Sequence, residues 1–148
     1  MGRVAHIAGE VHIDAPIGTV FDVVADSRNE PTYNPAMTRV ELLTPEPIGT
    51  GTQFRAYMGK AGTPMLVELT TVERPHLLAS RTTSSLMETS GTLSFTETDG
   101  GTTMRWDWQV RAKGWHRLLT PVFGLVGGKM EHSIWNGLKR HVESGRAS

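Results

Sequence analysis

Residues 121–143, PVFGLVGGKMEHSIWNGLKRHVE, decide the fold of this 148-residue chain. Successive residues of an α-helix lie about 100° apart, and on that spacing the apolar residues of the stretch gather on one broad stripe. The stripe consists of Val122, Phe123, Val126, Met130, Ile134, Gly137, Leu138 and His141. Thr120 can cap this helix, with Pro121 at its first position. We therefore predict one long amphipathic helix whose stripe covers a sheet.

The chain before this helix is a succession of strand-like segments. They comprise residues 39–43, 52–58, 65–73, 77–83, 87–97 and 103–111. The connections between them are too short for crossover helices, which predicts an antiparallel meander.

The first part of the chain adds one strand and two short helices. Apolar and polar residues alternate over residues 5–13, as in a strand with one buried face. Asp14 can cap a helix with Pro16 in its first turn, and residues 26–35 suit a second short helix. The predicted fold is α+β and of the helix-grip type: a curved seven-stranded antiparallel sheet, two short helices after strand 1, and a long C-terminal helix over the concave face.

The turn between the last two strands predicts which side chains face the helix. A two-residue Asp99–Gly100 turn pairs Phe95 with Met104, Leu93 with Trp106, Gly91 with Trp108, and Thr89 with Val110. A shift of the turn to Gly100–Gly101 preserves this parity, because side chains alternate with a period of two. Trp106 and Trp108 are therefore expected to point inward.

Composition excludes several classes of protein. Fifteen basic and fifteen acidic residues cancel, so no electrostatic footprint indicates a nucleic-acid partner. The absence of cysteine excludes disulfides, thiolate nucleophiles and cysteine-ligated metals. No stretch approaches the ~20 apolar residues of a membrane span, and the first residues lack the apolar core of a signal peptide. We expect a single cytoplasmic domain over residues 1–148, as a monomer or homodimer, without membrane insertion.

No catalytic or metal-binding motif stands out. The six histidines lie at positions 6, 12, 76, 116, 132 and 141, and no two form an i, i+4 pair with an acidic helper. The sequence contains neither a Gly-x-Ser-x-Gly elbow nor a phosphate-binding P-loop. We expect no metal and no cofactor, and we assign no catalytic residue.

The predicted faces supply candidate ligand contacts. The apolar candidates are Phe54, Met58, Trp106, Trp108, Phe123, Met130 and Ile134. The polar candidates are Tyr57 and Arg81 from the strands and His141 from the helix. The alternative to ligand contact for the apolar residues is ordinary packing in the core. For Tyr57 and Arg81 it is a position on the solvated convex face, and for His141 it is a ring packed against its neighbours. Trp108 is the strongest candidate, because a tryptophan opposite a glycine leaves space beside a flat ring.

Two features of the long helix leave alternatives open. Gly124, Gly127 and Gly128 each cost about 1 kcal/mol relative to alanine in a helix, so they indicate either a kink that follows the sheet or a mobile flap over a cavity. Trp135 lies off the predicted stripe and is expected to be a surface aromatic or an oligomer contact.

The order of elements resembles the helix-grip fold of the START-like, or SRPBCC, superfamily, and most closely its polyketide cyclase/dehydrase branch. The resemblance rests on VHIDAP (11–16), VFDVVAD (20–26), YNP (33–35), GTGT (49–52), VERP (72–75), GGTT (100–103) and LKRHVE (138–143). These motifs cover nearly the whole chain and mark helix entry, turns and helix termination. They name no substrate.

This resemblance implies a hydrophobic cavity that accepts a lipid, an aromatic polyketide or a similar molecule. Some members of the superfamily cyclise or dehydrate such ligands and others only bind them, without a shared catalytic motif. Three hypotheses follow: a carrier or sensor of a small hydrophobic molecule, a polyketide cyclase/dehydratase, or a regulatory protein-interaction module. The enzyme requires at least two convergent titratable groups in the cavity, one with a perturbed pKa. Because few ionisable residues face inward in the predicted sheet, the carrier or sensor is favoured.

Overall fold

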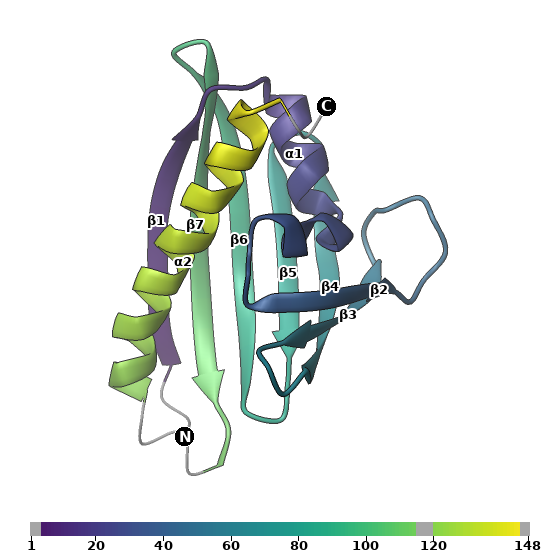
Figure 1. Ribbon diagram of the computed structural model, residues 1–148, viewed down its shortest axis with the longest axis vertical. Helices are drawn as coiled ribbons and strands as arrows, with labels where there is room; N and C mark the ends of the chain where they lie inside the picture. The colour runs from purple at the N-terminus through teal and green to yellow at the C-terminus, as the bar shows by residue number, and fades with distance from the viewer. Residues whose placement is uncertain (1–3, 115–119, 146–148) are drawn as a thin grey trace.

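Within residues 4–114 and 120–145, which the computed structural model describes, seven antiparallel strands form one curved sheet (Figure 1). The strand order across the sheet is β1-β7-β6-β5-β4-β3-β2. The elements along the chain are β1 (Val4–Ile13), α1 (Ile17–Ala25), the 3₁₀ helix η1 (Ser27–Thr32), β2 (Met37–Leu42), β3 (Gln53–Met58), β4 (Thr63–Glu73), β5 (Leu77–Thr83), β6 (Met87–Thr98), β7 (Gly101–Ala112) and α2 (Thr120–Glu143). The predicted α+β helix-grip architecture is confirmed.

The β6–β7 hairpin has the predicted register. Its two-residue turn places Asp99 and Gly100 at φ angles of 48° and 78°, the left-handed region that this tight turn requires. All four predicted pairs occur, including Leu93 with Trp106 and Gly91 with Trp108. Both tryptophan side chains are buried on the concave face, as the alternation of faces required.

Gly91 of β6 lies very close to the backbone of β7. It has a φ of 156°, and a Cβ atom there would lie 1.9 Å from the carbonyl oxygen of Asp107. The same Cβ would also press on the ring of Trp108. Glycine is therefore required by both the backbone conformation and the neighbouring strand.

Helix α2 packs over β1 and, less extensively, β7, at one end of the sheet (Figure 1). Among its described side chains, those of residues 126–143, the buried ones are Trp135, Leu138 and Val142, with Glu131 one turn before Trp135 on the same line. The expectation that Trp135 is a surface residue was therefore wrong: only 6% of it is exposed. The buried face is turned relative to the predicted stripe, because Trp135 packs against the rings of Tyr33 and Trp106, at centroid distances of 6.1 and 6.3 Å.

Two residues of the predicted buried stripe are instead exposed to solvent. Val126 is 49% exposed and Met130 is 45% exposed. The side chains of residues 120–125, including the predicted stripe residue Phe123, lie outside the described residues. The predicted buried stripe was therefore right at Leu138, near the end of the helix, and wrong near the middle, where Val126 and Met130 are exposed.

The glycines of α2 do not interrupt it, since the helix is continuous over its 24 residues. A Cβ atom at Gly137 would lie 2.5 Å from the carbonyl oxygen of Tyr33, so glycine allows α2 to approach the segment that follows η1. At Gly127 a Cβ atom would meet the side chain of Ile7 at 2.5 Å, whereas at Gly128 it would meet nothing within 4 Å. Close packing accounts for two of these glycines, and a moving flap stays a prediction.

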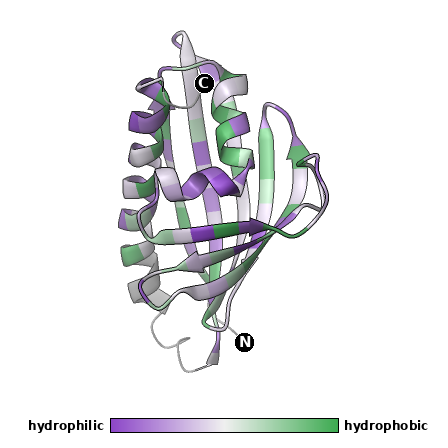
Figure 2. Cartoon of the chain, turned by 45° about the vertical axis from the view of Figure 1, so that its right-hand side comes forward, coloured by the Kyte–Doolittle hydropathy of each residue, from purple (hydrophilic) through white to green (hydrophobic). Residues whose placement is uncertain are grey.

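The short elements after β1 lie beside α2 on the concave face, with α1 against β6 and β7 and η1 against β2. Helix α1 buries Val20, Phe21, Val23 and Val24 against the sheet, with the ring of Phe21 edge-on to Phe95 at 5.1 Å. The hydrophilic η1 segment contacts α1 and β2 (Figure 2). None of the helices in the described part of the chain is long and apolar enough to cross a membrane.

Candidate functional site

A cavity of about 250 Å³ lies on the concave side of the sheet, beneath η1 and α2. This volume is far larger than the roughly 10–15 Å³ that accommodates one water molecule. The floor is apolar and comes from consecutive inward positions of neighbouring strands: Met65, Val67 and Leu69 of β4, Leu78 of β5 and Leu93 of β6. Met130, which lines the cavity and is 45% exposed, marks where it meets solvent.

Polar groups gather at the end of the cavity formed by η1 and α2. Ser27 and Glu30 come from η1, Asn34 follows it, and Glu131 and Trp135 come from α2. Hydroxyl groups from β5 and β6 also line the cavity at Ser80, Thr82 and Thr89. The site is thus an apolar pocket with one acidic end.

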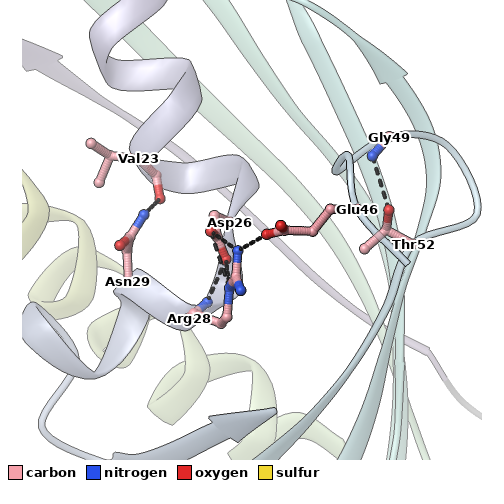
Figure 3. Close-up of polar contacts among 7 residues, drawn as sticks. All are labelled: Val23, Asp26, Arg28, Asn29, Glu46, Gly49 and Thr52. Atoms are coloured by element: carbon pink, nitrogen blue, oxygen red, sulfur yellow. Dashed lines mark hydrogen bonds and ion pairs between the residues drawn. The ribbon is translucent and has the colours of Figure 1, made fainter. Parts of the chain in front are cut away.

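The η1 helix is fixed from its solvent side (Figure 3). The Asp26 side chain accepts a hydrogen bond from the backbone N–H of Arg28 at 3.0 Å and caps the helix. The Arg28 guanidinium bridges Asp26 and Glu46, with N–O distances of 2.8 and 2.7 Å. The side chain of Asn29 donates to the carbonyl oxygen of Val23 at 3.1 Å, which ties η1 to the end of α1. These contacts use the outward side chains, and Glu30 is left to face the cavity.

The amide of Asn34 holds Glu30 in place from within. Its Nδ2 donates to Oε2 of Glu30 at 2.8 Å, while its Oδ1 accepts from the backbone N–H of Ala36 at 3.1 Å. The second interaction orients the amide so that its N–H group points at the carboxyl. Asn34 is 2% exposed, so its side of this hydrogen bond is shielded from water.

Burial perturbs both carboxyls. It raises the pKa of Glu30, and the hydrogen bond from Asn34 only partly opposes this effect. Burial also raises the pKa of Glu131 to about 7; the indole N–H of Trp135 lowers it in part and the charge of Glu30 raises it further. The pKa of the Tyr33 hydroxyl is raised by burial and then by the charges of Glu30 and Glu131. The two carboxyls therefore lie within electrostatic reach of one another.

Three polar atoms at this end lack hydrogen-bond partners among the described residues. They are Oε2 of Glu131 and the Nε1 atoms of Trp108 and Trp135. Both indole N–H groups lie close enough to Glu131 to lower its pKa as hydrogen-bond donors, but neither meets the geometry of a regular hydrogen bond with it. A buried polar atom without a partner costs roughly 1–3 kcal/mol, so such atoms in a cavity wall indicate a bound molecule or ordered water.

No lysine, arginine or histidine lines the cavity among the residues whose side chains are described. The same residues contain no cluster of His, Cys, Asp and Glu that could hold a metal ion. The chemistry available is therefore that of two carboxyls, two indole N–H groups, an amide and several hydroxyls.

The structure brings together four of the predicted ligand contacts: Met58, Trp108, Met130 and Ile134 all line the cavity. Phe54 and Trp106 are buried core residues that do not line it. Phe123 lies outside the described side chains. Ligand contact by any of these residues stays a prediction.

The three polar candidates lie elsewhere. Tyr57 is not among the cavity residues, and its ring is stacked under the guanidinium of Arg39, 4.3 Å from the ring centroid. Arg81 is exposed and lies beside Glu88. Its neighbour Ser80 lines the cavity, so the alternation of side chains along β5 places Arg81 on the other face of the sheet. His141 lies near the ring of Tyr33, at a centroid distance of 6.4 Å, in a separate surface depression.

Glu30 and Glu131, the two acidic residues that line the cavity in the described part of the chain, were not predicted from the sequence. The available signal for Glu131 was its position four residues before Trp135, which places both on one face of a helix. No comparable signal existed for Glu30, which lies in the uniformly polar segment SRNEPT.

The sequence matches, over residues 4–143, the family described as polyketide cyclase / dehydrase and lipid transport. The chain belongs to this family. Membership supports a role in binding hydrophobic small molecules or in cyclisation. No protein of curated function matches the sequence.

Solved structures of START-like proteins share the fold. The Zhui aromatase/cyclase from Streptomyces sp. R1128 has a TM-score of 0.79 at 17% identity, with 95% of this chain and 94% of that chain covered. A START superfamily protein from Mycobacterium smegmatis has a TM-score of 0.76 at 15% identity, with 94% and 97% covered. The di-domain aromatase/cyclase StfQ of the steffimycin biosynthetic pathway has a TM-score of 0.77 at 11% identity, with 98% of this chain and 52% of that chain covered. The resemblance inferred from the sequence is confirmed, and identities this low show the fold alone.

Proposed function

We propose that the protein binds a small, largely apolar molecule in the cavity between the sheet and α2, as a carrier or sensor. The observation that carries this proposal is a cavity with an apolar floor and a polar end at which buried groups lack partners. A bound molecule would cover the methionine and leucine side chains of the floor and orient itself on the polar end. This division is typical of small-molecule sites, in which apolar walls supply affinity and a few polar groups fix orientation.

A pair of neighbouring substitutions on β5 tests the location of the site. Ser80 lines the cavity and Arg81 faces the opposite side of the sheet, so Ser80→Leu fills the cavity and Arg81→Leu does not. We expect Ser80→Leu to weaken binding of the neutral apolar dye Nile red at least tenfold, with little change for Arg81→Leu. Fluorescence titration measures both affinities, and thermal unfolding checks that both variants are folded. Equal affinities in the two variants would place the bound dye elsewhere.

A polyketide cyclase or dehydratase is a second candidate function. It is favoured by the two electrostatically coupled carboxyls, because a carboxyl with a pKa of about 7 can donate and accept protons near neutral pH. Glu131 would exchange protons with the bound molecule, and the indole N–H groups beside it would stabilise its ionised form.

Turnover of aromatic polyketide-like substrates distinguishes the enzyme from the carrier. We expect Glu131→Gln to lower kcat at least a hundredfold and to leave Nile red binding within a factor of three. The kcat of the unaltered protein should change with an apparent pKa near 7 if this carboxyl takes part. An unaltered kcat in Glu131→Gln would remove it from the reaction.

A further inference from the structure

We propose that the molecule held in this cavity is a hydrophobic amine whose cationic nitrogen lies between the carboxyls of Glu30 and Glu131. This inference rests on the proposed binding function and names the class of ligand that the cavity takes. It follows from three properties of the acidic end: its charge, its unpartnered atoms and its aromatic walls.

The charge at this end is unbalanced. Several exposed carboxylates of the chain have cationic partners, such as Asp22 with Arg74 at 2.8 Å and Glu143 with Lys139 at 2.6 Å. Glu30 and Glu131 need a partner more, since they share a buried site, yet no cation lines the cavity among the described side chains. Only the neutral amide of Asn34 bonds either of them there.

Buried carboxyls of this kind either bind protons or bind a cation. An ionised carboxylate without a partner is costly in an apolar environment, and a positive charge within hydrogen-bond distance removes much of that cost. Burial raises the pKa of both carboxyls because their ionised forms lose the solvation of water, and the charge of Glu30 raises that of Glu131 further. An ammonium group would compensate an ionised carboxylate at this end, and it has three N–H donors for the two carboxyls to share.

The indole groups beside Glu131 oppose the effect of burial and favour its ionised form, the form that a cationic ligand would neutralise. Trp108 and Trp135 are 8% and 6% exposed, line the cavity, and have no hydrogen-bond partner for Nε1. Their N–H groups lower the pKa of Glu131, because donors favour a charged carboxylate over a neutral acid. A cation-binding site needs the charged form.

The walls of the cavity complement the rest of an amine. Indole rings attract cations through their faces, with about 0.5–2 kcal/mol per contact depending on desolvation. The apolar floor, with Val67, Leu69 and Leu93, leaves no polar partner for the remainder of the ligand except the hydroxyls near its middle. The expected ligand is therefore a compact aromatic or aliphatic skeleton with one basic nitrogen.

Two probes of the same shape separate this inference from the general binding function. The probes are 2-naphthylmethylamine, which is a cation at neutral pH, and 2-naphthylmethanol, its neutral counterpart. By isothermal titration calorimetry at pH 7.5, we expect the amine to bind at least tenfold more tightly than the alcohol. The preference should fall at pH 5, where Glu131 is protonated.

Variants that each remove one carboxylate test whether the cavity carboxyls cause the preference for the amine over the alcohol. Glu131→Gln and Glu30→Gln should each reduce it at least fivefold, whereas Glu97→Gln, which alters an exposed carboxylate of β6, should not. The two cavity variants are independent, so the inference stays testable if one of them fails to fold. Equal affinity for amine and alcohol would overturn the inference and leave the proposed binding function intact. Amine binding that all three variants retain would also overturn it, and failure to bind either probe or Nile red would overturn both proposals.

Discussion

Replacing Glu131 with glutamine is expected to stabilise the protein at alkaline pH and to change its stability little at acidic pH. Glutamine has the same shape as a protonated glutamic acid and cannot ionise. The comparison therefore isolates what ionisation of this one carboxyl contributes to the free energy of unfolding.

The pKa of Glu131 sets the size and the sign of the effect. It rises from 4.5 to about 7 on folding, so the folded state binds the proton more tightly than the unfolded state. This proton contributes stability that is fully present below pH 4.5 and is lost as the pH rises to about 7. With about 1.4 kcal/mol per pKa unit, the loss is at most about 3 kcal/mol above pH 7. The glutamine variant does not undergo this loss.

Urea denaturation between pH 5 and pH 8 measures the effect. At an m value of about 1–3 kcal/mol/M, a loss of about 3 kcal/mol corresponds to a midpoint of the variant about 1–3 M above that of the unaltered protein at pH 8, and we expect the two midpoints to approach each other at pH 5. Glu97→Gln is the control, since this exposed carboxylate should give parallel curves. Glu30 is present in all three proteins, so its own titration largely cancels. Parallel curves for Glu131→Gln would show that the carboxyl is solvated and would refute the electrostatic argument.

Two further sets of variants test the packing around the site. Trp108→Ala should weaken Nile red binding and destabilise the protein by about 3–5 kcal/mol, whereas Trp108→Phe should retain most of the dye affinity and most of the stability. Fluorescence titration and urea denaturation measure these two quantities. Full dye binding in a folded alanine variant would remove this residue from the cavity. Gly137→Ala should be destabilising because its Cβ atom would lie 2.5 Å from the carbonyl oxygen of Tyr33, whereas Gly128→Ala, with open space around it, should add up to about 1 kcal/mol of helix stability. Thermal unfolding compares this pair, and an equal shift in Tm for both would contradict the proposed close approach.

The sheet could be predicted from the sequence because its signals are local. The Asp99–Gly100 turn and the alternation of side chains on either side determine which face each residue of β6 and β7 occupies. A shift of one residue would have moved Trp106 and Trp108 to solvent, so burial of these large rings enforces the register. Such constraints act between neighbouring residues and need no knowledge of the remaining fold.

The face of α2 was less predictable, because a stripe of apolar residues does not show where a charged residue is buried. Glu131 lies on the same line as Trp135 and Leu138, but a carboxyl counts toward the solvent side in any pattern of hydrophobicity. Val126 and Met130 drew the predicted stripe away from that line, although both are exposed. A charged residue on the buried face of α2 therefore makes that face difficult to recognise from hydrophobicity alone.

The inward orientation of Glu30 was not predictable from its polar segment. Arg28 is held outside by Asp26, two residues away, and by the distant Glu46, while Asn34 bonds the carboxyl of Glu30 from four residues away. The first and last of these contacts are local, but which side of η1 faces the cavity is determined by its packing against α1 and β2. Functional sites commonly violate local sequence rules in this way.

The cost of burying two carboxyls is itself an argument about the ligand. Apolar side chains at these positions would avoid the loss of stability above pH 7, so the acids are better explained by what they bind than by what they stabilise. The two classes of ligand differ in the proton that accompanies binding. An amine lowers the pKa of Glu131 and releases a proton when it binds near pH 6.5, whereas a neutral carbonyl ligand that accepts a hydrogen bond from the protonated acid raises this pKa and takes a proton up. Calorimetry in two buffers with different ionisation enthalpies gives the sign of this exchange. Release supports a cationic ligand, and uptake supports a carbonyl compound of the kind that a cyclase or dehydratase transforms.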